Sequence, residues 1–235
     1  MKIRRAFLWE LRDCNMLKAV ALLMFYKNKY KSSTIKDFTY NKVHKETGLH
    51  STTIKKRISI LKRHNLVFFN NGHIVFRSIA SGNHKRNVDV ICEEMCVKDI
   101  EKSLYASMFI EIQRRKDFAR HTIQVAFNPS TYESLKNIKN ARRLCKRYGW
   151  DRKYTERGFS YNTIAKKLNV CLQKAFEIVK FAISKGFVEK VKHIVQIHVQ
   201  GIGYAKKYLT EECKGIFATK HNVYKAYANT YIIAQ

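Results

Sequence analysis

Residues 45–69 read "KETGLHSTTIKKRISILKRHNLVFF" and contain the signals of two helices joined by a tight turn. Gly48 suits the left-handed conformation that ends a helix, which predicts a short helix over about residues 40–47. Leu49 then points inward, and Ser51 has the right chemistry to cap the next helix by accepting a hydrogen bond from an unpaired backbone N–H. We therefore expect two helices that meet at a turn next to Gly48.

The longer helix, predicted over residues 51–65, carries an apolar stripe at spacings of four and three formed by Ile54, Ile58 and Leu61. After it, "LVFFNNGHIVF" (66–76) reads as strand, turn and strand, because Asn71-Gly72 is a favoured dipeptide for a tight hairpin. Upstream, "LKAVALLMFYKNKY" (17–30) is the expected first helix of the same unit.

A second copy of this pattern starts at Phe159, where "FSYNTIAKKLNVC" follows nearly the same rhythm as "FTYNKVHKETGLH" from Phe38. Asn169 occupies the turn position and tolerates left-handed geometry, and Gly186 ends the second long helix. "FVEKVKHIVQIHV" (187–199) is expected to supply a second pair of wing strands. Cys171 and Leu172 stand where a capping Ser is expected, so this cap is weaker.

Residues 17–76 resemble the winged helix-turn-helix of bacterial and phage DNA-binding proteins, in which a Gly, an apolar residue and a Ser precede a recognition helix and a short wing. The resemblance implies an α+β, mainly helical fold with two winged-helix modules joined by a structured helical connector. The expected domains are residues 1–78, 79–157 and 158–235. Such an architecture is similar to that of plasmid and phage replication initiators and phage transcription regulators, which makes the functional expectation an analogy.

The connector is neither low in complexity nor rich in Gly or Pro. "NVDVIC" (87–92) and "HTIQVAF" (121–127) read as short strands, and "DIEKSLYASMFIEIQRRKDF" (99–118) reads as a helix with Ile100, Leu104 and Met108 in register. "STYESLKNIKNARRLCKRYGW" (130–150) predicts a second helix. Its last turns are crowded with Lys and Arg, which suit the helix dipole and also a phosphate backbone.

The charge of the chain favours a polyanionic partner. Lys plus Arg number 46 against 18 Asp plus Glu, a formal net charge of +28. Nucleic acid is the leading candidate for a folded chain with this excess, ahead of an anionic membrane or an acidic protein. The apolar run at 19–26 is too short to span a bilayer, and the N-terminus does not read as a signal peptide, so we expect a protein of the bacterial cytoplasm.

The predicted DNA contacts of the first copy lie on the face of the long helix opposite its apolar stripe, on the flanks of that face and in the wing. They combine hydroxyl, amide, imidazole and cationic groups that can reach phosphates or base edges. The helix residues are Ser51, Thr52, Thr53, Lys55, Lys56, Arg57, Ser59 and Arg63, and the wing residues are Asn70, Asn71 and His73. The alternative is an ordinary solvated helix face, which is also rich in Lys in many proteins.

The long helix of the second copy is a weaker candidate for DNA contact. Its outward face includes Glu177, which would meet phosphate unfavourably, while Phe176 and Phe181 widen its apolar band. Packing against another domain or a second subunit explains this band better than DNA reading, so a homodimer is one possible arrangement. Lys180 of the helix, with Lys190 and Lys192 of the wing, remain candidate contacts.

Catalysis and a bound cofactor or metal are not expected. The sequence contains no phosphate-binding GxxxxGK[ST] loop and no GxSxG elbow, and Cys92 and Cys96 lack further ligands at zinc-finger spacing. The resulting expectation is a sequence-specific protein that binds double-stranded DNA, as a replication initiator or a transcriptional regulator. The alternative is a basic structural protein, virion-associated or nucleoid-like, which binds DNA without base preference or uses winged helices for assembly.

Overall fold

The computed structural model describes residues 1–80, 87–90, 92, 95–150, 159–197, 216–218 and 223–233. The fold is α+β and mainly helical, as the sequence predicts. The chain groups into two compact units. The first unit contains Met1–Phe109 and Leu168–Ala182, and the second contains Ile110–Lys167 and Ile183–Gln235.

The first unit is built on a buried helix, α2 (Leu17–Tyr30), which has Val20, Leu23 and Met24 fully enclosed. Next to it lie α1 (Arg5–Asp13), α3 (Tyr40–Thr47) and α4 (Ser51–Arg63). An antiparallel three-stranded sheet in the order β2-β4-β3 completes this part. Its strands are β2 (Thr34–Ile35), β3 (Val67–Asn70) and β4 (His73–Phe76). The predicted helix at 17–30, helix at 40–47 and hairpin within 66–76 are therefore present.

The turn between α3 and α4 has the predicted geometry at Gly48, whose φ is 66° and whose N–H donates to the His44 carbonyl at 2.8 Å. The predicted cap is wrong by one residue. His50 has an extended backbone, and its ring Nδ1 accepts a hydrogen bond from the Thr52 N–H at 3.4 Å. His50 is therefore the capping residue, and Ser51 is already the first residue of the helix.

The hairpin between β3 and β4 turns at Asn71 and Gly72, which have φ values of 45° and 74°. Two successive left-handed residues are typical of the two-residue turn whose twist matches that of the strands. Asn70 pairs with His73 and Val67 pairs with Phe76. Val67, Ile74 and Phe76 are buried in the first unit, so the hairpin stands on the same core as α4.

The long helix α5 (Val97–Phe127) corrects the prediction of a strand at 121–127. Thr122, Ile123 and Val125 favour a strand locally, but Ala119, Ile123 and Ala126 are buried at helical spacing. Packing along one helical face therefore outweighs the local β-propensity. At its other end the predicted register holds, because Ile100, Leu104 and Met108 are fully buried.

Two further elements complete the first unit. The predicted strand at 87–92 is present as β5 (Asn87–Asp89), which pairs antiparallel with β1 (Lys2–Arg4). The helix α9 (Leu172–Ser184) belongs largely to this unit. On α9, Lys174 Nζ lies 3.8 Å from Glu101 Oε1, and Lys102 of α5 lies over the Phe181 ring. Ala175, Ile178 and Ala182 form its buried face.

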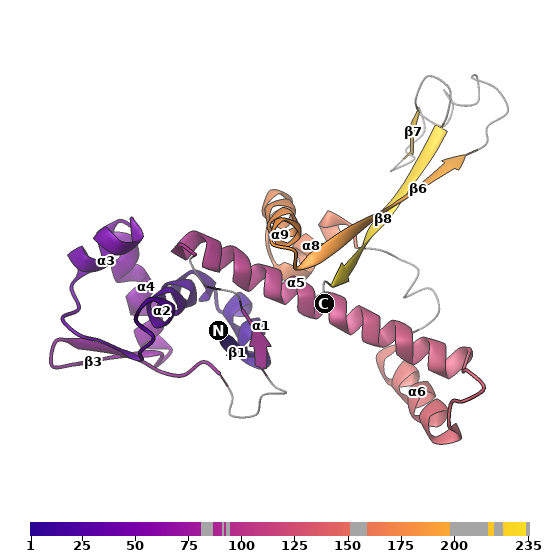
Figure 1. Ribbon diagram of the computed structural model, residues 1–235, viewed down its shortest axis with the longest axis horizontal. Coiled ribbons are helices and arrows are strands. Elements are labelled where there is room, and N and C mark those ends of the chain that lie inside the picture. Colours follow the sequence, from indigo (N-terminus) through magenta and orange to yellow (C-terminus); the bar gives the residue numbers. More distant parts are fainter. Residues whose placement is uncertain are drawn as a thin grey trace. The chain divides into compact units, whose positions relative to one another are not determined.

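The second unit contains a helical hairpin in which α6 (Leu135–Tyr148) packs on the C-terminal part of α5 (Figure 1). Ala141 and Cys145 of α6 are buried with Ile123 and Ala126 of α5. The unit also contains α8 (Tyr161–Leu168) and a three-stranded sheet in the order β6-β8-β7. These strands are β6 (Val188–Ile197), β7 (Ile216–Ala218) and β8 (Val223–Ile233).

The second predicted wing is wrong in its connectivity. Residues 188–197 form one continuous strand, which pairs antiparallel with β8 from Val188↔Ile233 to Ile197↔Val223. The sequence "VEKVKHIVQI" contains no Gly, Asn or Pro to turn the chain back, so the strand continues and its partner comes from the Tyr-rich C-terminal segment. The left-handed turn residues Asn169 (φ 54°) and Gly186 (φ 67°) are as predicted.

Candidate nucleic-acid interface

The outer face of α4 is cationic and carries hydroxyl groups. Ile54, Ile58 and Leu61 are buried and fix the rotation of the helix about its axis. At about 100° per residue, the opposite side falls on a contiguous set of positions. These exposed positions are Thr52, Lys55, Lys56, Ser59, Lys62 and Arg63. The helix contains no Asp or Glu, so this face offers donors and positive charge without a competing carboxylate.

Arg57 does not lie on this face, contrary to the prediction. Its side chain is buried, at 9% exposure, because it follows Ile54 by three residues and precedes Leu61 by four, which places it on the packed side. Burial lowers the pKa of the Arg57 guanidinium, and the charge of Glu101 on α5 opposes that shift. Arg57 therefore belongs to the packing between α4 and the first turns of α5.

The remaining predicted residues of the first copy differ in their accessibility. Ser51 and Thr53 are half-buried at the start of α4. In the β3–β4 hairpin, Asn70 and Asn71 are exposed. His73 is half-buried, and its Nδ1 accepts a hydrogen bond from the Asp37 N–H at 3.4 Å, so its ring also orders the segment before α3.

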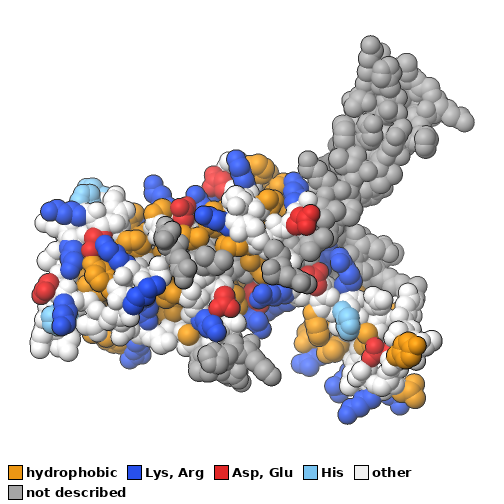
Figure 2. Space-filling view, in the orientation of Figure 1, with side chains coloured by type: hydrophobic (Ala, Val, Ile, Leu, Met, Phe, Trp, Pro, Cys, Tyr) orange, Lys and Arg blue, Asp and Glu red, His pale blue; other side chains and the backbone are white. Residues whose placement is uncertain are grey.

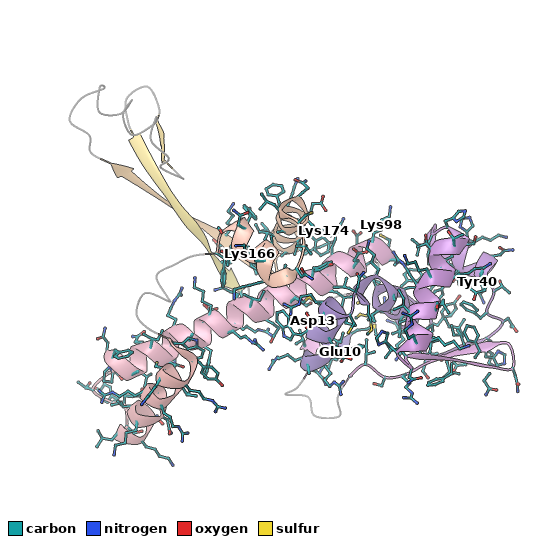
Figure 3. All side chains as sticks on the ribbon, turned by 180° about the vertical axis from the view of Figure 1, so that it is seen from behind. Glu10, Asp13, Tyr40, Lys98, Lys166 and Lys174 are labelled. Atoms are coloured by element: carbon teal, nitrogen blue, oxygen red, sulfur yellow. The ribbon has the colours of Figure 1, made fainter. Side chains whose placement is uncertain are left out.

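An aromatic cluster next to α4 was missed by the sequence reasoning. The Phe38 ring lies 5.6 Å from that of Tyr40 and 5.9 Å from that of Phe69, both edge to face. Lys55 Nζ lies 5.6 Å from the Tyr40 ring, which stands at the start of α3 (Figure 3). The cluster connects the β3–β4 hairpin to the start of α3 and positions one cation of α4. The sequence feature that could have indicated this cluster is "FTYN" (38–41), in which two aromatic residues are separated by one residue just before α3.

A polar contact holds α3 against α2. The Tyr30 hydroxyl donates to the Glu46 carboxylate, and Lys29 Nζ lies 3.0 Å from Glu46 Oε1. Burial and the hydrogen bond to Glu46 raise the pKa of Tyr30 to about 12. Burial alone would raise the pKa of Glu46, but hydrogen bonds from Tyr30 and Lys29 hold it below its ordinary value. This contact fixes the helix from which the chain turns into α4.

The three lysines predicted to contact DNA from the second copy differ in their environments. Lys180 is exposed on α9. Lys190 is half-buried, and its Nζ donates to the Tyr161 hydroxyl at 3.2 Å and lies 5.3 Å from the Tyr161 ring. The side chain of Lys192 lies outside the described residues. On α9, Phe176 of the predicted apolar band is 45% exposed, and Leu172 at the start of the helix is 52% exposed.

Cations are not confined to α4. Figure 2 shows Lys and Arg side chains spread over the N-terminal elements, with Asp and Glu side chains interspersed among them. In the described parts of the chain, no group of three or more His, Cys, Asp and Glu side chains is placed to hold a metal ion. No helix among the described residues is both long and apolar enough to cross a membrane.

Comparisons with protein-family models, characterised proteins and solved structures found no match for this chain.

Proposed function

We propose that residues 17–76 form a winged-helix module that reads double-stranded DNA with α4. The segment resembles the winged helix-turn-helix family in the order of its elements, which is two helices, a turn, a third helix and a wing. In the chain, α2, α3, α4 and the β3–β4 hairpin follow that order. The observation that carries the proposal is the exposed face of α4, which is cationic, rich in hydroxyl groups and free of carboxylates.

The mechanism is insertion of this face into the major groove, which is wide enough for an α-helix. Lys56 and Arg63 would contact phosphates or guanine edges, while Thr52 and Ser59 can reach either the backbone or a base. The exposed Asn70 and Asn71 of the wing would lie against the adjacent phosphate backbone. His50 and Gly48 act indirectly, because they set the start and the direction of α4.

The biological role that fits such a reader is a replication initiator or transcriptional regulator of a plasmid or phage, acting in the bacterial cytoplasm. The second copy would contribute assembly more than reading. Leu172 and Phe176 are exposed apolar side chains on α9, and Glu177 is exposed beside them. An apolar face next to a carboxylate suits a protein partner or a second copy of the chain better than phosphate.

A basic structural protein is the second candidate function, and the spread of cations over elements other than α4 favours it (Figure 2). Such a protein would bind phosphates without reading bases, so its affinity would fall steeply with salt and show no preferred sequence. The two functions therefore differ in one measurable quantity, the affinity ratio between a preferred duplex and a scrambled one at equal salt.

The test begins with selection of bound duplexes from a random library. Their affinity is then compared with that of scrambled duplexes for the native chain and for Lys56→Ala/Arg63→Ala. We expect a consensus sequence, and we expect the double variant to lose about ten-fold or more in affinity for it, with a smaller preference. The matched control is Lys2→Ala/Lys18→Ala, which removes the same charge from exposed positions of β1 and α2.

Two results would count against the reading by α4. Equal loss in the two double variants would mean that charge alone drives binding. A steep salt dependence with no consensus would favour the structural protein.

A further inference from the structure

The outward face of α6 is a continuous cationic surface in the second unit. Ala141 and Cys145 face α5 and are buried, which fixes the rotation of the helix about its axis. The opposite side, at about 100° per residue, carries a row of exposed cations and no carboxylate. These residues are Lys136, Lys139, Arg143, Lys146 and Arg147. None of them forms an ion pair with a carboxylate in the described part of the chain.

Arg142 has a different task on the same helix. Its Nε donates to the Ala126 carbonyl of α5 at 3.1 Å, so it anchors α6 in the helical hairpin. The five exposed cations therefore stand on a fixed support, and from Lys136 to Arg147 the helix rises by about 16 Å. Figure 2 shows Lys and Arg side chains gathered around this helix.

An aromatic cluster closes the C-terminal end of this surface. The Trp150 ring is stacked on Tyr148 with centroids 4.9 Å apart, and the Phe118 ring meets it edge to face at 5.9 Å. Phe118 is 55% exposed and Tyr148 is 53% exposed. The Arg147 guanidinium lies 5.6 Å from the Tyr148 ring, so the cationic row and the aromatic cluster are contiguous.

The cluster is held in place before any ligand arrives. Gly149 has a φ of 64° and ends α6, and its N–H donates to the Cys145 carbonyl. The Trp150 N–H reaches the same carbonyl at 3.0 Å. These two hydrogen bonds turn the chain so that Trp150 returns over the end of its own helix. The helix terminus thus orders the rings, and the packing of Trp150 against the buried cluster of Ala141 and Cys145 supports them.

We propose that the outward face of α6 and the cluster of Phe118, Tyr148 and Trp150 bind single-stranded nucleic acid. The cations would follow the phosphates, and exposed ring faces would stack on unpaired bases. A duplex offers only base edges in its grooves, so it could use the cations but not the rings. An acidic polypeptide such as polyglutamate likewise pairs with the cations and leaves the exposed rings without a stacking partner.

Single-stranded DNA and RNA share this chemistry, so the first measurement uses both. The chain contains two tryptophans, and Trp9→Phe leaves Trp150 as the reporter. The full-length variant is titrated with oligo-dT and oligo-U of about ten nucleotides, a length typical of single-strand sites. We expect quenching of Trp150 fluorescence with saturation by at least one of the two oligonucleotides. Absence of any change at saturation, measured in parallel by anisotropy of a labelled oligonucleotide, would overturn the proposal.

Side-chain variants then separate stacking from charge. In Phe118→Leu/Tyr148→Leu we expect about ten-fold weaker single-strand binding, since a base stack is lost while apolar bulk remains. Tyr148→Phe keeps a ring and should keep the native affinity. The matched control is Tyr132→Leu, which removes a 97% exposed ring outside the cluster and should change nothing. Native affinity in the double variant, with an unchanged circular dichroism spectrum, would refute the role of the rings.

The contribution of the exposed cations of α6 is measured by the salt dependence of single-strand binding. Lys139→Gln/Arg143→Gln/Lys146→Gln should lower the salt slope of single-strand binding by about two, the value for three phosphate contacts on a single strand. Lys56→Ala/Arg63→Ala should leave oligo-dT binding unchanged, so failure of this proposal and failure of duplex reading by α4 are distinguishable. Equal competition by polyglutamate or by a duplex of the same length would overturn the proposal in favour of charge alone.

Discussion

Arg57 and Arg63 stand on one helix but differ in environment, and this difference can be measured. Arg57→Ala should lower the free energy of unfolding by about 2 kcal/mol, because it removes a packed stem and one of the two cations that act on Glu101, the other being Lys174. Arg63→Ala should weaken binding to the selected duplex and leave thermal unfolding nearly unchanged, since Arg63 is exposed. Thermal denaturation and duplex affinity of the two variants test this reciprocal pattern. The reverse pattern would contradict the assignment of Arg57 to packing.

Glu46 should make the stability of the first unit depend on pH. Its pKa is lowered in the folded chain, so its contribution is present above the ordinary pKa and is lost as the pH falls through the folded value. Glu46→Gln should reduce the free energy of unfolding by about 1 kcal/mol at pH 7. The difference from the native chain should shrink below the ordinary value of 4.5.

Chemical denaturation of the native chain and of Glu46→Gln at several pH values measures the difference in their free energies of unfolding. Glu10→Gln, at an exposed carboxylate of α1 (Figure 3), is the control for a change in net charge. A difference between Glu46→Gln and the native chain that stays constant down to acid pH would argue against a stabilising charged form of Glu46.

The candidate site was predictable in part from single residues. Thr52, Lys56, Ser59 and Arg63 lie opposite Ile54, Ile58 and Leu61 on any regular helix, so their exposure follows from spacing alone. The spacing also places Arg57 near the packed side, but residue type suggested a phosphate contact. The cap at His50 and the Lys55–Tyr40 contact depend on side-chain geometry, which the sequence does not specify.

The β3–β4 hairpin provides a test at the level of an element. Gly72 has a φ of 74°, and a Cβ added there would meet no atom within 4 Å, so the cost of Gly72→Ala is conformational. We expect a loss of about 1 kcal/mol in the free energy of unfolding. Asn71→Gly should be neutral or slightly stabilising because Gly adopts the left-handed conformation at less cost. Thermal denaturation of the two variants measures these effects, and an equal loss of stability in Gly72→Ala and Asn71→Gly would contradict the observed turn.

Elements whose signals are local were predicted well, whereas elements that depend on distant partners were not. α2, α3 and α4 follow from apolar spacing and from Gly48, and the first hairpin follows from Asn71-Gly72. The strand predicted at the end of α5 is wrong because Thr122 and Ile123 favour a strand in isolation, while the burial of Ile123 and Ala126 against α6 requires a helix. The partner of β6 could not be inferred, since β8 begins at Val223, far along the chain.

At the scale of the whole molecule, the net charge of +28 is distributed over more than one candidate surface. The exposed face of α4 belongs to the first unit, and the cationic face of α6 belongs to the second. Each surface has its own buried anchor, Ile54 with Leu61 in one case and Ala141 with Cys145 in the other. Variants of one surface can therefore be compared with variants of the other in the same full-length chain.

The pairing of β6 with β8 also determines when the second sheet can form during synthesis. Val188 can pair only after Ile233 has left the ribosome, and no residue of β6 can pair with β8 before Val223 has done so. The hairpin of β3 and β4, in contrast, needs no residue later than Phe76. A nascent chain would thus complete its first sheet early and carry an unpaired strand edge late, a stage at which chaperone binding or aggregation competes with folding.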